Sequence, residues 1–142
     1  SYGDKDNYPL IEPWTPTPPE VTATIDIDPD TLNLRSYGHW ITAYIQLPEG
    51  YNAADIDAST ILLNGVIAPV LDSKYGFVTN SREYLVDHDG DGILERMVKF
   101  DRASLASWIC QSVKMRHEVT LAITGELTDG TLFAATATIF VF

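Results

Sequence analysis

The sequence predicts an all-β fold: an antiparallel, immunoglobulin-like β-sandwich with one short helix and an extended N-terminal arm. From residue 21 onward, short segments alternate apolar and polar residues, and Gly, Asn, Asp and Pro separate them. The chain has 142 residues, of which 45% are hydrophobic, and this is enough for the core of one domain. Seven or eight strands of this kind imply two packed sheets.

The first 20 residues differ in composition from the rest. Five of the eight prolines lie there, and proline lacks an N–H donor and favours extended geometry. Two interpretations stay open: a tether, or an arm whose apolar residues dock on another surface. We therefore divide the chain into an arm, residues 1–20, and a sandwich domain, residues 21–142. The arm carries four apolar side chains that a plain linker does not need: Tyr8, Leu10, Ile11 and Trp14.

The first strand is expected over residues 21–28, because four apolar residues share one face: Val21, Ala23, Ile25 and Ile27. Asn64 and Gly65 form a hairpin turn after a strand at residues 59–64 and lead into residues 66–68. The remaining strands are expected at residues 39–47, 83–86, 94–100, 118–124 and 131–142.

One helix is expected, over residues 102–109, with Asp101 as its N-cap. Leu105, Trp108 and Ile109 lie on one side of it. Cys110 follows and is interpreted as a small buried hydrophobic residue rather than a nucleophile. A single cysteine also excludes an intrachain disulfide and a zinc site built from cysteines.

The most informative motif is DHDGDGILE at residues 87–95. Carboxylates at alternate positions followed by glycine wrap a hard cation in oxygen ligands, as calcium prefers. Position 12, which holds a bidentate Glu in an EF-hand, is Val98, and the flanks have the pattern of strands. The sequence therefore predicts a short calcium loop of the DxDxDG kind, with a solvated acidic turn as the alternative. The expected ligands are Asp87, Asp89, Asp91, the backbone carbonyl of Ile93, and Glu95.

Further ligands of this ion would come from water or from another acidic residue. His88 stands at an even position of the loop, so we expect its ring to point away from the ion into solvent. A second acidic group in residues 26–30 is interpreted as a solvated strand face and turn, with a second cation site as the alternative. The candidates for additional ligands are Asp72, Glu83 and Asp101.

The charge of the chain excludes some partners. It carries 9 Lys+Arg against 20 Asp+Glu, a formal net charge of −11. Nucleic acid and anionic membranes call for a basic face, so neither is expected as a partner. No apolar run reaches the ~20 residues of a membrane helix. Since the chain starts with Ser1 and shows no signal peptide, we interpret it as a processed product or part of a longer protein.

The sequence shows no catalytic constellation. Its histidines lack a nucleophile in a known setting, and no phosphate loop or dinucleotide fingerprint is present, so we do not expect an enzyme. Aromatic residues could form a platform for a sugar, although several are needed for the core. These are Trp14, Tyr37, Trp40, Tyr51 and Tyr75.

Three segments in order, residues 25–65, the acidic loop with residues 97–105, and residues 119–139, resemble a β-sandwich module of archaeal and bacterial cell-surface proteins. Residues 3–14, GDKDNYPLIEPW, are similar to the closing segment of right-handed β-helix surface proteins, which such modules often follow. The resemblance implies a secreted, non-catalytic, calcium-stabilised domain, and it implies no particular ligand.

Two functions follow from these observations. The first is a structural subunit of an extracellular fibre, in which the arm or the strand at residues 21–27 joins copies head to tail by strand addition. Twenty extended residues reach roughly 60 Å at ~3.3 Å each. The second is a carbohydrate-binding or spacer module that the arm tethers to adjoining cell-surface domains.

Overall fold

The computed structural model describes residues 20–33, 38–112 and 118–141, with the side chains of residues 110–112 excepted. The predicted arm lies outside these residues apart from Glu20. The four predicted interface residues of the arm, the aromatic Tyr37 and the side chain of Cys110 also lie outside what is described. The predictions made for them stay predictions.

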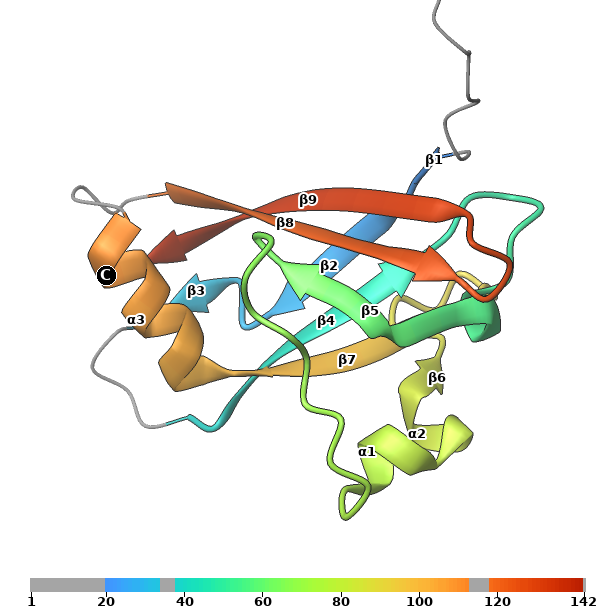
Figure 1. Cartoon of the computed structure of the whole chain (residues 1–142), viewed down its shortest axis with the longest axis horizontal. Helices are drawn as coiled ribbons and strands as arrows, with labels where there is room; N and C mark the ends of the chain where they lie inside the picture. The colour runs from blue at the N-terminus through green and yellow to red at the C-terminus, as the bar shows by residue number, and fades with distance from the viewer. Residues whose placement is uncertain (1–19, 34–37, 113–117, 142) are drawn as a thin grey trace, which may run out of the picture.

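Two β-sheets pack face to face and enclose the core (Figure 1). This confirms the all-β class and the two-layer arrangement. The first sheet has the order β1 (Glu20–Thr22), β9 (Leu132–Val141), β8 (Glu118–Leu127) and β5 (Ile56–Leu63), and β3 (Thr31–Leu32) also pairs with β9. The second has the order β2 (Thr24–Asp28), β4 (Trp40–Gln46), β7 (Glu95–Asp101) and β6 (Leu85–Val86).

The strand predicted over residues 21–28 divides between the two sheets. Its apolar residues are all buried as predicted, but β1 pairs with β9 and β2 pairs with β4. The change of sheet falls at Ala23, whose N–H donates to the carbonyl of Ala134 at 2.9 Å. Both β1 and β3 run parallel to β9, so the prediction of a wholly antiparallel sandwich is wrong. Alternation of residues records which side of a strand is buried and carries no information about its pairing partner.

The later strands follow the predicted pattern with shifted ends. β5 begins at Ile56 and β8 continues to Leu127, beyond the stretches that alternate clearly in sequence. Asn64 and Gly65 both have positive φ, at 52° and 75°, as the predicted hairpin turn requires. Among the described residues, a single bridge between Leu63 and Ile67 follows this turn in place of the expected strand.

The predicted helix is present as α3 (Arg102–Ser112) and closes one end of the sandwich (Figure 1). Asp101 caps it, since its Oδ2 accepts from the N–H of Ser104 at 3.1 Å and from the Ser104 hydroxyl at 2.8 Å. Leu105 and Ile109 are fully buried, and Trp108 packs against the core. No helix in the described part of the chain has the length and apolar character needed to cross a bilayer.

Three further helical turns make the prediction of one helix wrong. They are η1 (Ala53–Asp55), α1 (Gly76–Thr79) and α2 (Ser81–Tyr84). Each spans three or four residues, which is too short to produce a helical period in the sequence. Because α2 occupies residues 81–84, the strand predicted at residues 83–86 shrinks to the two residues of β6.

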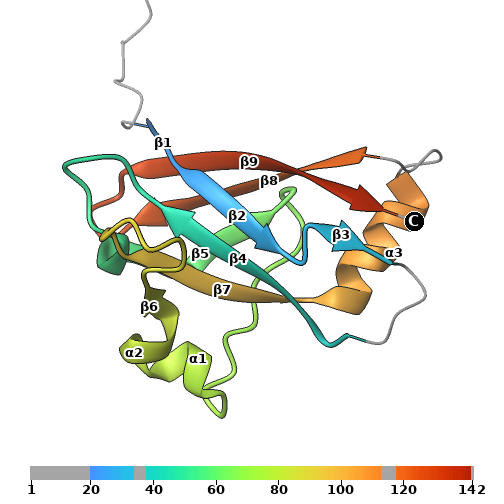
Figure 2. The same cartoon turned by 180° about the vertical axis from the view of Figure 1, so that it is seen from behind.

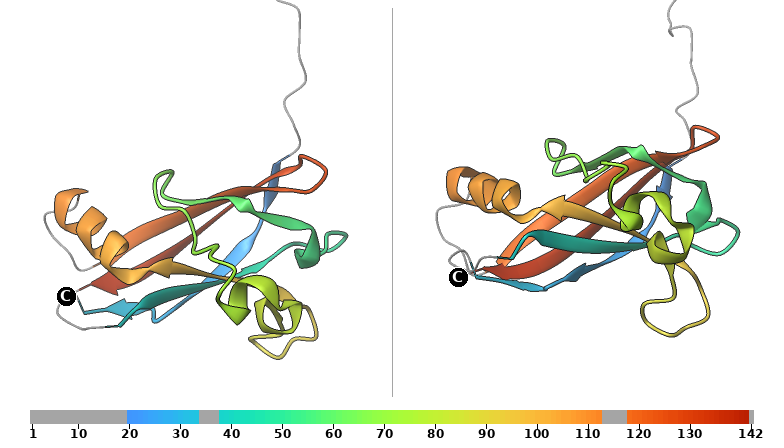
Figure 3. Two further views of the ribbon diagram at one scale, coloured as in Figure 1. Left: turned by 60° about the horizontal axis from the view of Figure 1, so that its bottom comes forward. Right: turned by 90° about the horizontal axis from the view of Figure 1, so that it is seen from below.

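Several connections meet at the end of the sandwich opposite α3, which we call the loop end (Figure 2). Strand β1 begins there, and Thr24 of β2 pairs with Gln46, the last residue of β4. The N–H of Thr128, in the β8–β9 turn, donates to the carbonyl of Asp55 at 2.8 Å. The β6–β7 loop leaves at the same end and projects away from both sheets (Figure 3). The acidic motif of the sequence therefore lies at the loop end.

Candidate metal centre

The acidic motif forms the connection between β6 and β7. These strands are antiparallel, and Val86 pairs with Glu95, so the first and last acids of the motif are held at the base of one loop. Gly90 and Gly92 have φ values of 75° and 85°, which glycine adopts without strain. The pairing of β6 with β7 thus brings Asp87 close to Glu95, although eight positions separate them in the sequence.

Three carboxylates converge in this loop. One oxygen atom from each of Asp87, Asp89 and Glu95 lies within 4.8 Å of the other two. Asp87 and Asp89 are exposed, whereas Glu95 is only 3% exposed. Carboxylate oxygens in such a group are suitable ligands for a hard cation, and calcium completes its shell of six to eight oxygens with carbonyls and water.

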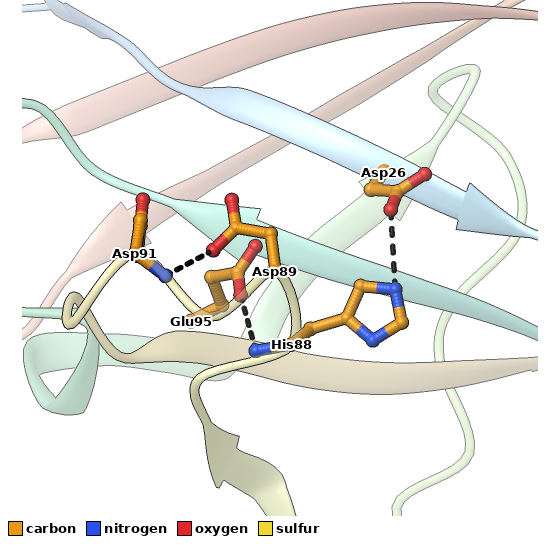
Figure 4. A network of polar contacts seen from close by, with 5 residues as sticks. All are labelled: Asp26, His88, Asp89, Asp91 and Glu95. Carbon is orange, nitrogen blue, oxygen red and sulfur yellow. Dashed lines mark hydrogen bonds and ion pairs between the residues drawn. The ribbon is translucent and has the colours of Figure 1, made fainter.

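Asp91 and Ile93, the other two predicted ligands, do not belong to this group of three carboxylates. Asp91 lies outside the three-carboxylate group and beside Asp89 (Figure 4), and its Oδ1 accepts from the N–H of Ile93 at 2.9 Å. Its own N–H donates to Asp87 Oδ1 at 3.1 Å and to Asp89 Oδ1 at 3.3 Å. Asp91 therefore supports the turn, and its carboxylate and the Ile93 carbonyl both remain predicted ligands.

Backbone N–H groups hold the carboxylates in place. Asp87 Oδ2 accepts from the N–H of Gly92 at 2.8 Å, and Glu95 Oε1 accepts from the N–H of His88 at 2.7 Å. These bonds cross the loop, because they join residues five and seven positions apart. The loop is therefore folded around its carboxylates by its own backbone.

The carboxylates of Asp89 and Asp91 affect each other's pKa values. The pKa of Asp89 is raised, first by desolvation and then by the carboxylates of Asp91 and Asp87, although the N–H of Asp91 opposes the rise. The pKa of Asp91 is lowered, chiefly by the hydrogen bond from the N–H of Ile93. Mutual repulsion of this kind favours a proton or a cation between the groups.

Glu95 is the buried carboxylate of the group. Its pKa is raised mainly by burial, and the charge of Asp89 raises it further, whereas the hydrogen bond from the N–H of His88 and the charge of the His88 ring lower it. Within the described residues, no lysine or arginine forms an ion pair with Glu95. A buried carboxylate without a lysine or arginine partner is costly, and a bound cation would offset that cost.

His88 points away from the three carboxylates, as predicted, but it is not simply solvated. Its ring stacks on Tyr44 with centroids 3.7 Å apart and planes 6° apart. Its Nε2 lies 3.2 Å from Asp26 Oδ2 on β2 (Figure 4). The loop is thereby attached to the outer face of the second sheet. No signal in the sequence pairs His88 with Asp26, since the two residues are 62 positions apart and the contact arises from the sheet.

The additional ligand candidates do not join the group. Asp72 lies 3.7 Å from Lys74, Glu83 accepts from the side-chain amide of Asn80 at 3.3 Å, and Asp101 caps α3. The acidic group of residues 26–30 forms no metal-ligand cluster within the described part of the chain. The geometry therefore leaves one candidate centre there, built from Asp87, Asp89 and Glu95.

Of the predicted aromatic platform the structure describes Trp40, Tyr51 and Tyr75, and these three do not form one surface. Trp40 packs edge-on against Tyr75 and Phe77, with centroids 5.5 and 5.7 Å away, and this cluster joins α1 to the second sheet. Tyr51 lies beyond the other end of β4, at the loop end. Trp40 and Tyr75 are half-buried by these contacts, so they present little free ring surface.

Comparison with known proteins identifies no relative of this chain. No family model matches the chain, and neither a curated protein nor a solved structure matches it. The functional interpretation therefore depends on the residues themselves and on the resemblance described for the sequence.

Proposed function

We propose that the protein is a non-enzymatic, extracellular structural module whose β-sandwich is stabilised by calcium bound in the β6–β7 loop. The observation that carries this proposal is the buried carboxylate of Glu95, which lies beside Asp87 and Asp89 and lacks an ion-pair partner among the described residues. The resemblance to modules of cell-surface proteins supports the location and the structural role.

The donor set favours calcium over other metals. All three carboxylates offer oxygen, and the one histidine of the loop, His88, turns its ring toward Asp26. Transition metals and zinc prefer nitrogen or sulfur ligands, whereas calcium accepts oxygen alone with flexible geometry. Two of the three carboxylates are exposed, so water molecules have access to fill the remaining positions.

A bound ion would stabilise more than the loop. Glu95 is the first residue of β7, which pairs with both β4 and β6. His88 adds a contact from the loop to β2, at the edge of the same sheet. An ion between Asp87 and Glu95 would therefore restrain the loop and its attachment to the second sheet together.

Copies of the chain then join head to tail through the N-terminal segment. The support for this part is the composition of residues 1–20, in which apolar anchors alternate with prolines. Contacts of one surface with a different surface of the next copy generate open filaments. Light scattering and electron microscopy of the full chain test it. Fibres that persist in a Leu10→Ser/Trp14→Ser variant would contradict it.

Isothermal titration of the full chain with calcium tests the metal centre. We expect saturable binding to one site, which Asp89→Asn weakens by tenfold or more, because each lost charged ligand raises the dissociation constant. Asp30→Asn is the matched control, since this carboxylate is exposed and lies outside the group. Equal binding by the two variants would place the ion elsewhere.

A further inference from the structure

A shallow hollow of about 450 Å³ lies at the loop end, beside the metal centre. Large apolar side chains are unusually exposed around it: Tyr51 is 45% and Ile93 50% exposed, and the adjacent Leu94 is 50% exposed. Exposed apolar groups that gather around a concave surface mark a contact site. The hollow is lined by Gln46, Leu47, Pro48, Glu49, Tyr51 and Ile93.

The walls of the hollow combine apolar and polar groups. Leu47, Pro48 and Ile93 offer hydrocarbon, Tyr51 offers a ring, and the side chains of Gln46 and Glu49 offer oxygen acceptors. An indole side chain has the matching properties, because it buries a large apolar body and needs an acceptor for its single N–H donor. The hollow is therefore suited to a tryptophan.

The N-terminal segment starts close to this site. Strand β1 begins at the loop end, where Thr24 pairs with Gln46 of the hollow (Figure 2). Nineteen residues precede Glu20 in the sequence, and at ~3.3 Å per residue the last six of them reach roughly 20 Å from it. Trp14 is the tryptophan of that segment and lies six positions before Glu20.

We propose that the hollow receives Trp14 of a second copy of this chain. The inference depends on the proposed head-to-tail assembly and names its receiving surface. Ile93 belongs both to the hollow and to the metal loop, where its N–H donates to Asp91 at 2.9 Å. The position of this wall is therefore fixed by the same turn that arranges the carboxylates.

Cross-linking of the full chain tests the inference. Trp14 is replaced by p-benzoylphenylalanine, another bulky aromatic residue, and equal amounts of unlabelled and heavy-isotope-labelled protein are mixed with calcium and irradiated. We expect mass spectrometry to find cross-links from position 14 to residues 46–51 or to Ile93 that join light to heavy chains.

Other cross-linking patterns overturn the inference in distinguishable ways. Cross-links at the hollow within one isotope class alone would mean that the chain's own segment occupies it. Light-to-heavy cross-links at another surface would remove the hollow and leave the proposed assembly standing. A monomer by light scattering without cross-links between chains would overturn both.

A surface variant supplies an independent test. Tyr51→Ser removes an exposed wall of the hollow, and we expect it to weaken association of copies by about tenfold or more. Leu62→Ser is the matched control, since Leu62 is also an exposed apolar residue, at 37%, and does not line the hollow. Equal association of both variants with wild type would overturn the proposal.

Discussion

At the scale of single residues, the burial of Glu95 is the feature by which the candidate metal centre differs from an ordinary acidic turn. The spacing of the motif predicts it as a ligand, but its burial arises from the position at the start of β7, against β4 and β6. Asp91 shows the converse. Its spacing is equally suitable for a ligand, yet its carboxylate accepts from the N–H of Ile93 and supports the turn. Spacing identifies the loop, and the local hydrogen bonds decide which acids converge.

Glu95→Gln is expected to change stability in opposite directions with and without calcium. Without the ion, the variant should melt at the same temperature or higher, because it removes a buried charge and keeps an oxygen for the N–H of His88. With the ion, affinity should fall by at least about tenfold, as it does when groups around a metal are lost. Differential scanning calorimetry with and without calcium measures both effects. A variant that melts far below wild type in chelator would show that Glu95 stabilises the fold without a cation.

The stabilisation by calcium is expected to shrink as the pH falls. The pKa values of Asp89 and Glu95 are raised in the folded protein. In the calcium-free chain, these groups therefore favour folding most below the pKa of an unfolded carboxyl and least above the raised pKa. Calcium requires both groups deprotonated, so its contribution has the opposite dependence. Melting with and without calcium at pH 7 and at about pH 4.5, near the ordinary carboxyl range, measures this. A shift in melting temperature that is independent of pH would contradict it.

At the scale of elements, the alternation of residues predicts the strands well and their partners poorly. Val21, Ala23, Ile25 and Ile27 all face the core, yet the strand that holds them changes sheet at Ala23. The pairing depends on β9 and β4, which lie far away in the sequence. The turns α1 and α2 were missed because each depends on a local bond, such as the N–H of Arg82 to the Asn80 side chain at 3.0 Å, rather than on a period.

Close packing around Gly125 explains why a glycine lies in the middle of β8. A Cβ atom built there would meet two carbons of the Phe133 ring at 2.7 Å and Ile61 Cγ1 at 3.2 Å. Since Phe133 is 1% exposed, the ring has little room to move. Gly125→Ala should therefore destabilise the protein by about 1–3 kcal/mol, as overpacking of a core does. Urea unfolding measures this, with Thr124→Ala as an exposed control on the same strand. An unchanged midpoint for Gly125→Ala would mean that the two sheets adjust freely at this point.

At the scale of the whole molecule, the two ends of the sandwich differ, because the candidate binding features lie at one end only of the described structure. Helix α3 closes one end, and the β6–β7 loop and the start of β1 lie at the other (Figures 1 and 2). The exposed hollow lies at that end too, because Gln46 and Ile93 line it. This division follows from the register of the strands, which no short motif encodes. Part of the acidic composition lies in this loop, since residues 87–95 hold four of the 20 acidic residues. One calcium ion bound there would change the formal charge from −11 to −9.

The central claim is that calcium bound by Asp87, Asp89 and Glu95 stabilises this fold. The most direct measurement is the melting temperature of the full chain in excess calcium and in excess chelator. At a calcium concentration about 100 times the dissociation constant, mass action contributes ~2.7 kcal/mol, and for a domain of this size that corresponds to several degrees. We expect a rise of that order in wild type and in Asp30→Asn, and its loss in Asp89→Asn. Identical melting temperatures of the wild type in calcium and in chelator would contradict the claim.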